Sequence, residues 1–127
     1  MDLTEEELHF LQSILDLARE GDAEALATAI DSGVPANLTS GAGDSLLILA
    51  AYHNHPETVR VLLERGADVT RVNDRGQTAL GAAVFRRNAT SVDLLLAAGA
   101  DPDQGARSAR DIAQFFELPE MLALLPS

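Results

Sequence analysis

The sequence contains no cysteine, no lysine and no tryptophan. Without cysteine, neither a disulfide framework nor thiol chemistry is available. No segment approaches the roughly 18 consecutive apolar residues that a membrane-spanning helix requires, so we expect no membrane partner. All nine basic residues are arginines. Together with the abundance of alanine, this indicates a GC-rich and therefore bacterial genome.

Aromatic residues make up only 4% of the 127 residues, whereas hydrophobic residues make up 46%. This composition predicts one domain, spanning residues 1–127, with an aliphatic core. The net charge of −11 argues against a nucleic-acid partner, which requires a basic face. Residues 1–40 hold nine acids and a single arginine. An acidic N-terminus lacks the positive charge of a secretory signal, so we expect a cytoplasmic protein.

What the sequence does contain is a repeat of 33 residues. Gly33, Gly66 and Gly99 follow this spacing, as do the Leu62-Leu63 and Leu95-Leu96 pairs. A fixed period of about 20–50 residues is typical of a solenoid, in which each unit buries its apolar face only against its neighbours. Function is then expected on an extended surface rather than in a deep pocket.

Helix signals recur along this period. The segment Thr4-Glu-Glu-Glu7 predicts a capping box at the start of a helix that ends near Glu20. Its apolar stripe is expected to face inward, and consists of Leu8, Leu11, Leu15 and Ala18. Shorter helices are expected within residues 23–32, 46–53, 56–65, 78–86, 88–98, 108–116 and 119–125. No strand of ordinary length is required.

With these features the chain resembles an ankyrin-repeat protein. The resemblance rests on two segments that end alike, Val59-Arg-Val-Leu-Leu-Glu-Arg-Gly-Ala-Asp68 and Val92-Asp-Leu-Leu-Leu-Ala-Ala-Gly-Ala-Asp101. It implies an all-α solenoid of four helix-turn-helix units joined by β-turn fingers. The units are expected at about 4–39, 40–72, 73–104 and 105–127. The first and last would be caps.

The chain departs from the family pattern at the start of the first helix of each unit. The usual proline and histidine are replaced by Leu46 and Ile48 in the second unit, and by Ala79 and Gly81 in the third. The interactions that the family builds with those two residues are therefore not expected. A glycine inside a helix costs roughly 1 kcal/mol relative to alanine.

The resemblance implies a protein–protein interaction module that binds through its concave face and finger tips. Mapping those positions onto this chain gives a set of candidate partner-binding residues. They are Asp44, Tyr52, His53, Asp74, Arg75, Gln77, Phe85, Arg86, Arg107 and Phe115. Tyr52, Phe85 and Phe115 occupy equivalent positions and predict an aromatic row across the stack. Glu20, His53, Arg86 and Phe116 form the neighbouring column.

Two alternatives remain open at this stage. The aromatic row could pack between the repeats as core, or it could present its rings to a partner, since aromatic residues and arginine are enriched in binding hot spots. The finger arginines Arg71, Arg75 and Arg107 could bind an acidic partner segment, or they could be solvated surface charges of little energetic consequence.

No pattern in the sequence indicates catalysis, a cofactor or a metal. It contains no recognisable nucleophile elbow, phosphate loop or paired-carboxylate motif, and His53 and His55 lack further ligands at a suitable spacing. We therefore expect a regulator or adaptor that is monomeric alone and is not an enzyme. The alternative is a structural, chaperone-like accessory subunit that stabilises one enzyme. Such a subunit would expose a large apolar patch and self-associate.

Overall fold

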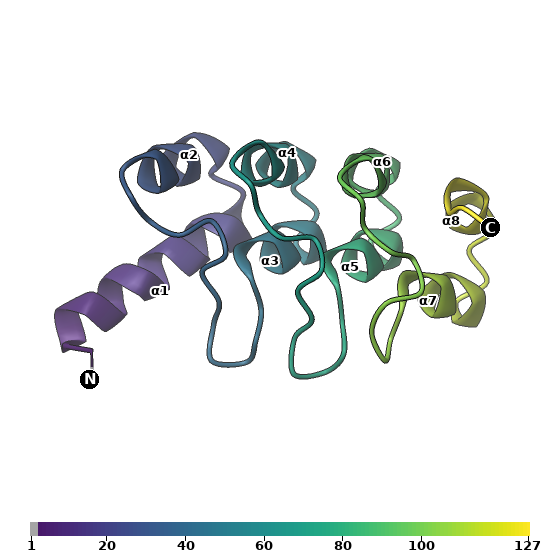
Figure 1. Cartoon of the computed structure of the whole chain (residues 1–127), viewed down its shortest axis with the longest axis horizontal. Coiled ribbons are helices and arrows are strands. Elements are labelled where there is room, and N and C mark those ends of the chain that lie inside the picture. Colours follow the sequence, from purple (N-terminus) through teal and green to yellow (C-terminus); the bar gives the residue numbers. More distant parts are fainter. Residues whose placement is uncertain (1–2) are drawn as a thin grey trace.

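The computed structural model describes residues 3–127, which form a stack of helix pairs (Figure 1). The helices are α1 (Glu5–Glu20), α2 (Ala23–Asp31), α3 (Leu46–Tyr52), α4 (Pro56–Glu64), α5 (Ala79–Phe85), α6 (Ala89–Ala97), α7 (Ala109–Phe115) and α8 (Pro119–Leu124). The odd-numbered helices form an inner row and the even-numbered ones an outer row. Three long connections, the fingers (32–45, 65–78 and 98–108), project beside the inner row.

This architecture confirms the predicted all-α solenoid with projecting turns. The described residues contain no strand, and their only β-pairing is an isolated bridge between Thr39 and Ser45. Within the inner row, α3 packs against α1 and α5, and α5 packs against α7. The exact boundaries of the four units stay a prediction.

The start of each inner helix is fixed by a hydroxyl side chain. Thr4, Ser45, Thr78 and Ser108 are the N-cap residues, and each side-chain oxygen accepts a hydrogen bond from a backbone amide of the first turn. Such a cap satisfies a donor that the helix itself cannot pair. Thr4 and Glu7 form the predicted capping box. The capping side chain therefore determines the residue at which each inner helix begins.

The turn from each inner helix to its outer partner passes through the left-handed region. The residues at this position are Gly21, Asn54, Arg87 and Glu117, with φ between 53° and 77°. Glycine adopts this conformation without steric cost. At Gly21 a side chain would also collide with the ring of His55, since an added Cβ would lie 2.4 Å from Nδ1. The His55 Nε2 atom in turn lies 2.8 Å from the backbone oxygen of Arg19.

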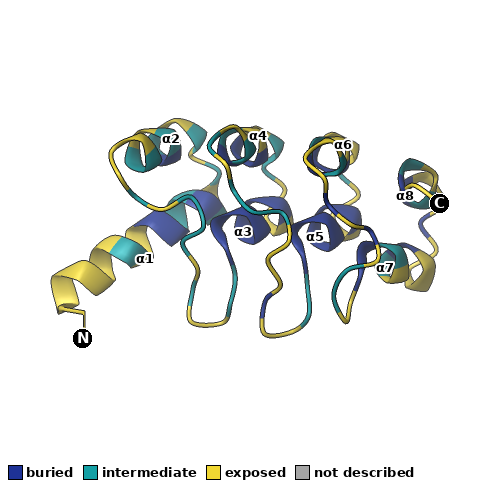
Figure 2. Ribbon diagram, viewed as in Figure 1, coloured by how far each residue is buried: buried dark blue, intermediate teal, exposed yellow. Residues whose placement is uncertain are grey.

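The core lies between the two rows and along the inner row (Figure 2). Residues 46–51 of α3 and residues 79–84 of α5 are all buried. The outer helices α4 and α6 bury one side, centred on Leu62 and Leu95. This is the arrangement that the repeated leucine pairs predict.

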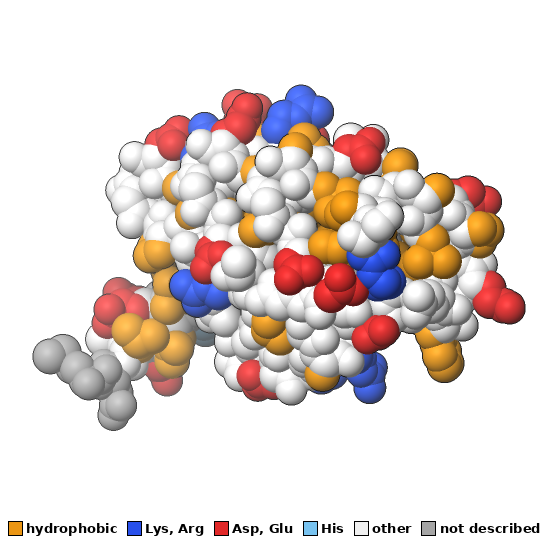
Figure 3. All heavy atoms as spheres, turned by 45° about the vertical axis from the view of Figure 1, so that its right-hand side comes forward, with side chains coloured by type: hydrophobic (Ala, Val, Ile, Leu, Met, Phe, Trp, Pro, Cys, Tyr) orange, Lys and Arg blue, Asp and Glu red, His pale blue; other side chains and the backbone are white. Residues whose placement is uncertain are grey.

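The prediction that the whole apolar stripe of α1 faces inward is wrong for its first part. Ile14, Leu15 and Ala18 are buried, but Leu8 is 51% exposed. The reason is length: α1 has 16 residues and α3 has seven, so the first part of α1 projects beyond the stack (Figures 1 and 2). Figure 3 shows hydrophobic and acidic side chains together on this projecting part.

Candidate partner-binding face

A continuous row of aromatic rings runs along the ends of α3, α5 and α7. The rings of Tyr52 and Phe85 are stacked with centroids 6.1 Å apart and planes 4° from parallel. Phe85 meets Phe116 edge-on at 5.6 Å, and Phe116 meets Phe115 edge-on at 4.9 Å. All of these side chains are exposed, from 41% for Tyr52 to 81% for Phe115. The rings therefore touch one another while keeping a large surface open to solvent.

The order of rings corrects the expected row at its last member. Phe115 was expected beside Phe85, but Phe116 takes that place, and the two phenylalanines of the last unit follow each other along the row. Phe85 and Phe115 are each the last residue of their helix, so their positions along the chain are equivalent. The period does not show which of the two adjacent rings of the last unit reaches Phe85.

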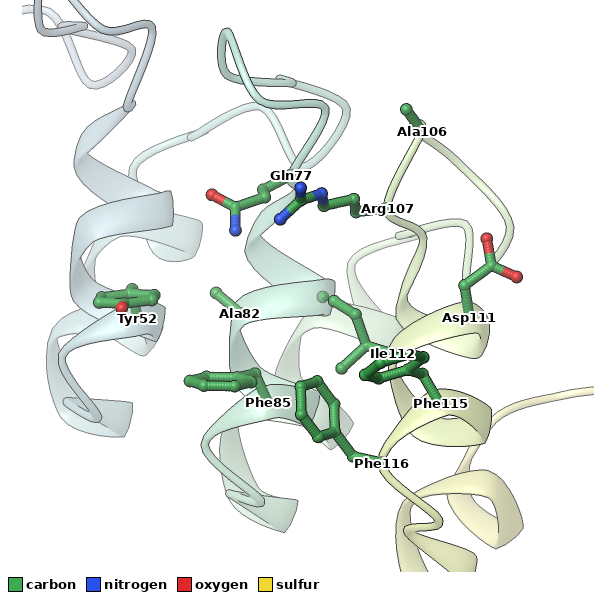
Figure 4. Close-up of a pocket in the computed structure, with 11 residues that line it drawn as sticks. Tyr52, Gln77, Ala82, Phe85, Ala106, Arg107, Asp111, Ile112, Phe115 and Phe116 are labelled. Carbon is green, nitrogen blue, oxygen red and sulfur yellow. The ribbon is translucent and has the colours of Figure 1, made fainter.

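A groove of about 540 Å³ opens beside this row, between α5, α7 and the fingers (Figure 4). Ala82 and Ile112 line it together with the rings. Gln77 and Arg107 lie at its finger end, whereas Phe85, Phe115 and Phe116 gather at the other end. The groove thus combines an apolar surface with a few polar groups, which is the usual composition of a binding site.

Gly81 lines the groove and lies close to α7 and its finger. An added Cβ at this position would lie 3.2 Å from the Ile112 Cδ1 atom and 3.4 Å from the backbone oxygen of Arg107. A side chain here would therefore crowd its neighbours. The departure from the family pattern at this position has a packing reason that the sequence alone did not reveal.

A smaller hollow of about 180 Å³ adjoins the groove and shares Tyr52, Gln77 and Ala82 with it. His53, Asp44 and Arg75 are among its other lining residues. Partial burial lowers the pKa of His53 below its ordinary value, and nearby cationic groups act in the same direction while Asp44 opposes them. The groups that act with burial are His55, Arg19 and Arg86.

A hydrogen-bond network centred on Asn73 holds the fingers. The Asn73 Nδ2 atom donates to Asp44 Oδ1 at 2.8 Å and to Gln77 Oε1 at 2.9 Å. The Asn73 Oδ1 atom accepts from the backbone amides of Arg75 and Gln77 at 3.0 and 2.9 Å. Neighbouring fingers are also joined by backbone bonds, from Asp74 to Ala42 and from Arg107 to Gly76. Asp44 and Gln77 thus have structural partners besides any role in binding.

The structure brings together eight of the ten candidate residues. Tyr52, Gln77, Phe85, Arg107 and Phe115 line the groove, and Asp44, Tyr52, His53, Arg75 and Gln77 line the hollow. Asp74 and Arg86 are exposed but line neither. Phe116, which the sequence places in the neighbouring column, also lines the groove, as does Ile112, which nothing in the period marks.

The described part of the chain shows no helix that is long and apolar enough to cross a membrane. Within residues 3–127, no three His, Asp or Glu side chains are grouped so that they could hold a metal ion.

Comparison with known proteins gives a family match. A family model described as ankyrin repeats, in three copies, matches residues 14–106. An ankyrin repeat protein of Pseudomonas aeruginosa is 43% identical over 60 residues, which are 47% of this chain and 35% of that protein. An ankyrin repeat-containing protein of Treponema pallidum is 36% identical over 117 residues, 88% of this chain and 39% of that protein. The chain thus spans well under half the length of these two bacterial relatives.

Some relatives are enzymes of which only a small part is similar. The human NAD-capped RNA hydrolase is 49% identical over 70 residues, which are 54% of this chain but only 15% of that enzyme. A match to such a small fraction carries no activity over to this chain. The shared property is the repeat.

Proposed function

The chain belongs to the ankyrin-repeat family, whose members are generally non-catalytic modules for protein–protein interaction, and we propose that it is a regulator or adaptor that binds a partner protein reversibly through its inner face. By inner face we mean the groove, the adjoining hollow and the finger tips above them. The proposal retains the expectation of a cytoplasmic protein that is monomeric on its own.

The observation that carries the proposal is the exposed aromatic row along the groove. Phe85 is 43% exposed although it contacts rings on both sides. An apolar patch of this kind on a soluble domain often marks an interaction site, and tyrosine and arginine at its border are the types that dominate binding energy. The rings support the partner-binding interpretation over the core interpretation, because a core ring would be covered.

Affinity capture with matched variants tests this proposal. The wild-type protein, Phe85→Ala and the control Phe10→Ala are used to retain proteins from an extract of the organism that encodes the chain. Phe10 is 53% exposed and lies on α1, away from the groove, so both variants remove one exposed ring. Circular dichroism melting checks that each variant folds.

We expect one protein to be retained by the wild type and by Phe10→Ala, and its affinity to fall about tenfold or more with Phe85→Ala. Such a loss corresponds to roughly 1.4 kcal/mol, which exceeds the cost of truncating most interface residues. Loss of the same protein with Phe10→Ala alone would move the binding site to α1 and contradict the proposal.

The accessory-subunit alternative has one observation in its favour, the projecting part of α1. Leu8 and Phe10 are both about half exposed there, and a subunit that is stable only in a complex would expose such a surface. Light scattering after size exclusion separates the two functions. A monodisperse monomer favours the regulator, whereas self-association that disappears in Phe10→Ala favours the accessory subunit.

A further inference from the structure

The nine arginines fall into two groups. Five form ion pairs with carboxylates at 2.7–3.4 Å: Arg19 with Asp16, Arg60 with Glu57, Arg65 with Asp31, Arg71 with Asp68, and Arg110 with Asp103. The other four have no carboxylate partner within residues 3–127, and they are Arg75, Arg86, Arg87 and Arg107. This is unexpected in a chain with 20 acidic residues.

Three of the four unpaired arginines border the inner face. Arg107 lines the groove and Arg75 lines the adjoining hollow, both on the finger side. Arg86 follows Phe85 at the opposite border and helps to lower the pKa of His53. Arg71 is one of the three finger arginines named from the sequence. It forms an ion pair with Asp68 and is therefore not available to a partner in the same way as Arg75 and Arg107.

Three carboxylates share this surface with the arginines, and within residues 3–127 none of them forms an ion pair with Arg75, Arg86 or Arg107. Asp44 accepts a hydrogen bond from Asn73 Nδ2, and Asp74 is exposed on its finger. Asp111 also lines the groove, but Figure 4 shows its carboxylate directed away from the rings, whereas Arg107 extends toward Gln77. An unpaired guanidinium can bind a carboxylate through two parallel hydrogen bonds without first giving up an internal partner.

The overall charge of −11 would by itself favour a basic partner, as would the exposed rings through cation–π contact. Eight of the acids, however, lie within residues 3–40, at the other end of the stack from α7. Because charges in physiological salt are screened over about 8 Å, that pole has little influence on the groove. The local arginines should therefore decide which charge is preferred.

We infer that the partner presents a segment in which a bulky apolar side chain enters the groove beside Phe85 and Phe116, while a neighbouring acidic residue binds Arg107. Arg75 and Arg86 lie beside this site and can bind further acidic residues of the same segment. This inference rests on the proposed function and adds the chemistry of the partner. The aromatic row supplies the apolar contact, and the unpaired arginines supply the selection for carboxylates.

A library of random twelve-residue peptides, displayed on phage and selected on the immobilised full chain, tests the inference. We expect the selected peptides to combine Leu, Ile, Phe or Trp with Asp or Glu. The best peptide, synthesised with a fluorescent label, should bind Arg107→Glu at least fivefold more weakly than the wild type, and more weakly in high salt. The control Arg60→Glu makes the same change of charge on α4 and should leave the affinity unchanged.

The outcomes separate this inference from the proposed function. If the selected peptides are rich in Lys or Arg, the inference that the partner segment is acidic is wrong. It is also wrong if Phe85→Ala weakens peptide binding but Arg107→Glu does not. In both cases the inner face remains the binding site. A peptide that binds Phe85→Ala as well as the wild type overturns both. If the wild type selects no peptide above an unrelated protein, the inference is also overturned, because segments of the stated chemistry are present in the library.

Discussion

The inner and outer rows of helices differ in how much of each helix is buried. In α3 and α5, six of seven residues are buried, whereas in α4 and α6 the number is three of nine. An inner helix is enclosed by neighbours on both sides of its row and by the outer row. The final residue of α3 or α5, Tyr52 or Phe85, is the one that reaches solvent. In α3 and α5, the side chains that are exposed enough to contact a partner are therefore those at the helix ends.

The same difference explains the small residues of the inner row. Ala50, Ala51 and Ala83 are completely buried, and Gly81 meets the side chain of Ile112 on the next inner helix. Close-packed interiors tolerate added volume poorly. The outer helices meet the core along one side, so their exposed sides can vary without affecting the stack.

The largest expected effect is on the free energy of unfolding, when one leucine in each row is replaced by alanine. Leu80 on α5 is 1% exposed, whereas Leu96 on α6 is only partly buried. We expect Leu80→Ala to lower the free energy of unfolding by about 2–5 kcal/mol, because it leaves a cavity. Leu96→Ala should cost about 1 kcal/mol. Urea unfolding followed by circular dichroism measures both, and equal losses would show that the two rows are equally constrained.

A smaller effect is expected in the fingers, which extend the inner row. Asn73→Ala removes all four side-chain hydrogen bonds of a residue that is 6% exposed. Leaving these partly buried partners unpaired should lower the free energy of unfolding by about 1–3 kcal/mol. The neighbouring exposed Asp74→Ala is the control and should change it by less than about 0.5 kcal/mol. Similar values for the two variants would mean that the network does not hold the fingers.

These features differ in how far the sequence could predict them. The repeat, the capping box of Thr4 and Glu7 and the buried Leu62 and Leu95 follow from spacing and local chemistry, and the structure confirms them. Five of the eleven residues that line the groove were also accessible as candidate positions. A period, however, identifies positions along the chain and not distances between side chains of neighbouring units.

That limit accounts for what was missed. The contact of Phe116 with Phe85 depends on which of two adjacent side chains turns toward α5. The exposure of Leu8 depends on where α3 ends relative to α1. Which arginines are ion-paired and which are not depends on side-chain contacts such as that between Arg65 and Asp31, which are 34 residues apart in sequence.

The smallest expected effect lies at the turn that joins the two rows. Glu117 has a φ of 53°, a conformation that costs a non-glycine residue roughly 1–2 kcal/mol. Glu117→Gly removes this strain but makes the unfolded chain more flexible, so we expect a net gain of about 0.5 kcal/mol in the free energy of unfolding. Glu120→Gly makes the same change three residues later, inside α8, and should instead cost about 1 kcal/mol. Because the two variants lose the same side chain, opposite signs in urea unfolding would isolate the backbone as the cause, whereas a loss in both would show that the left-handed turn stores no strain.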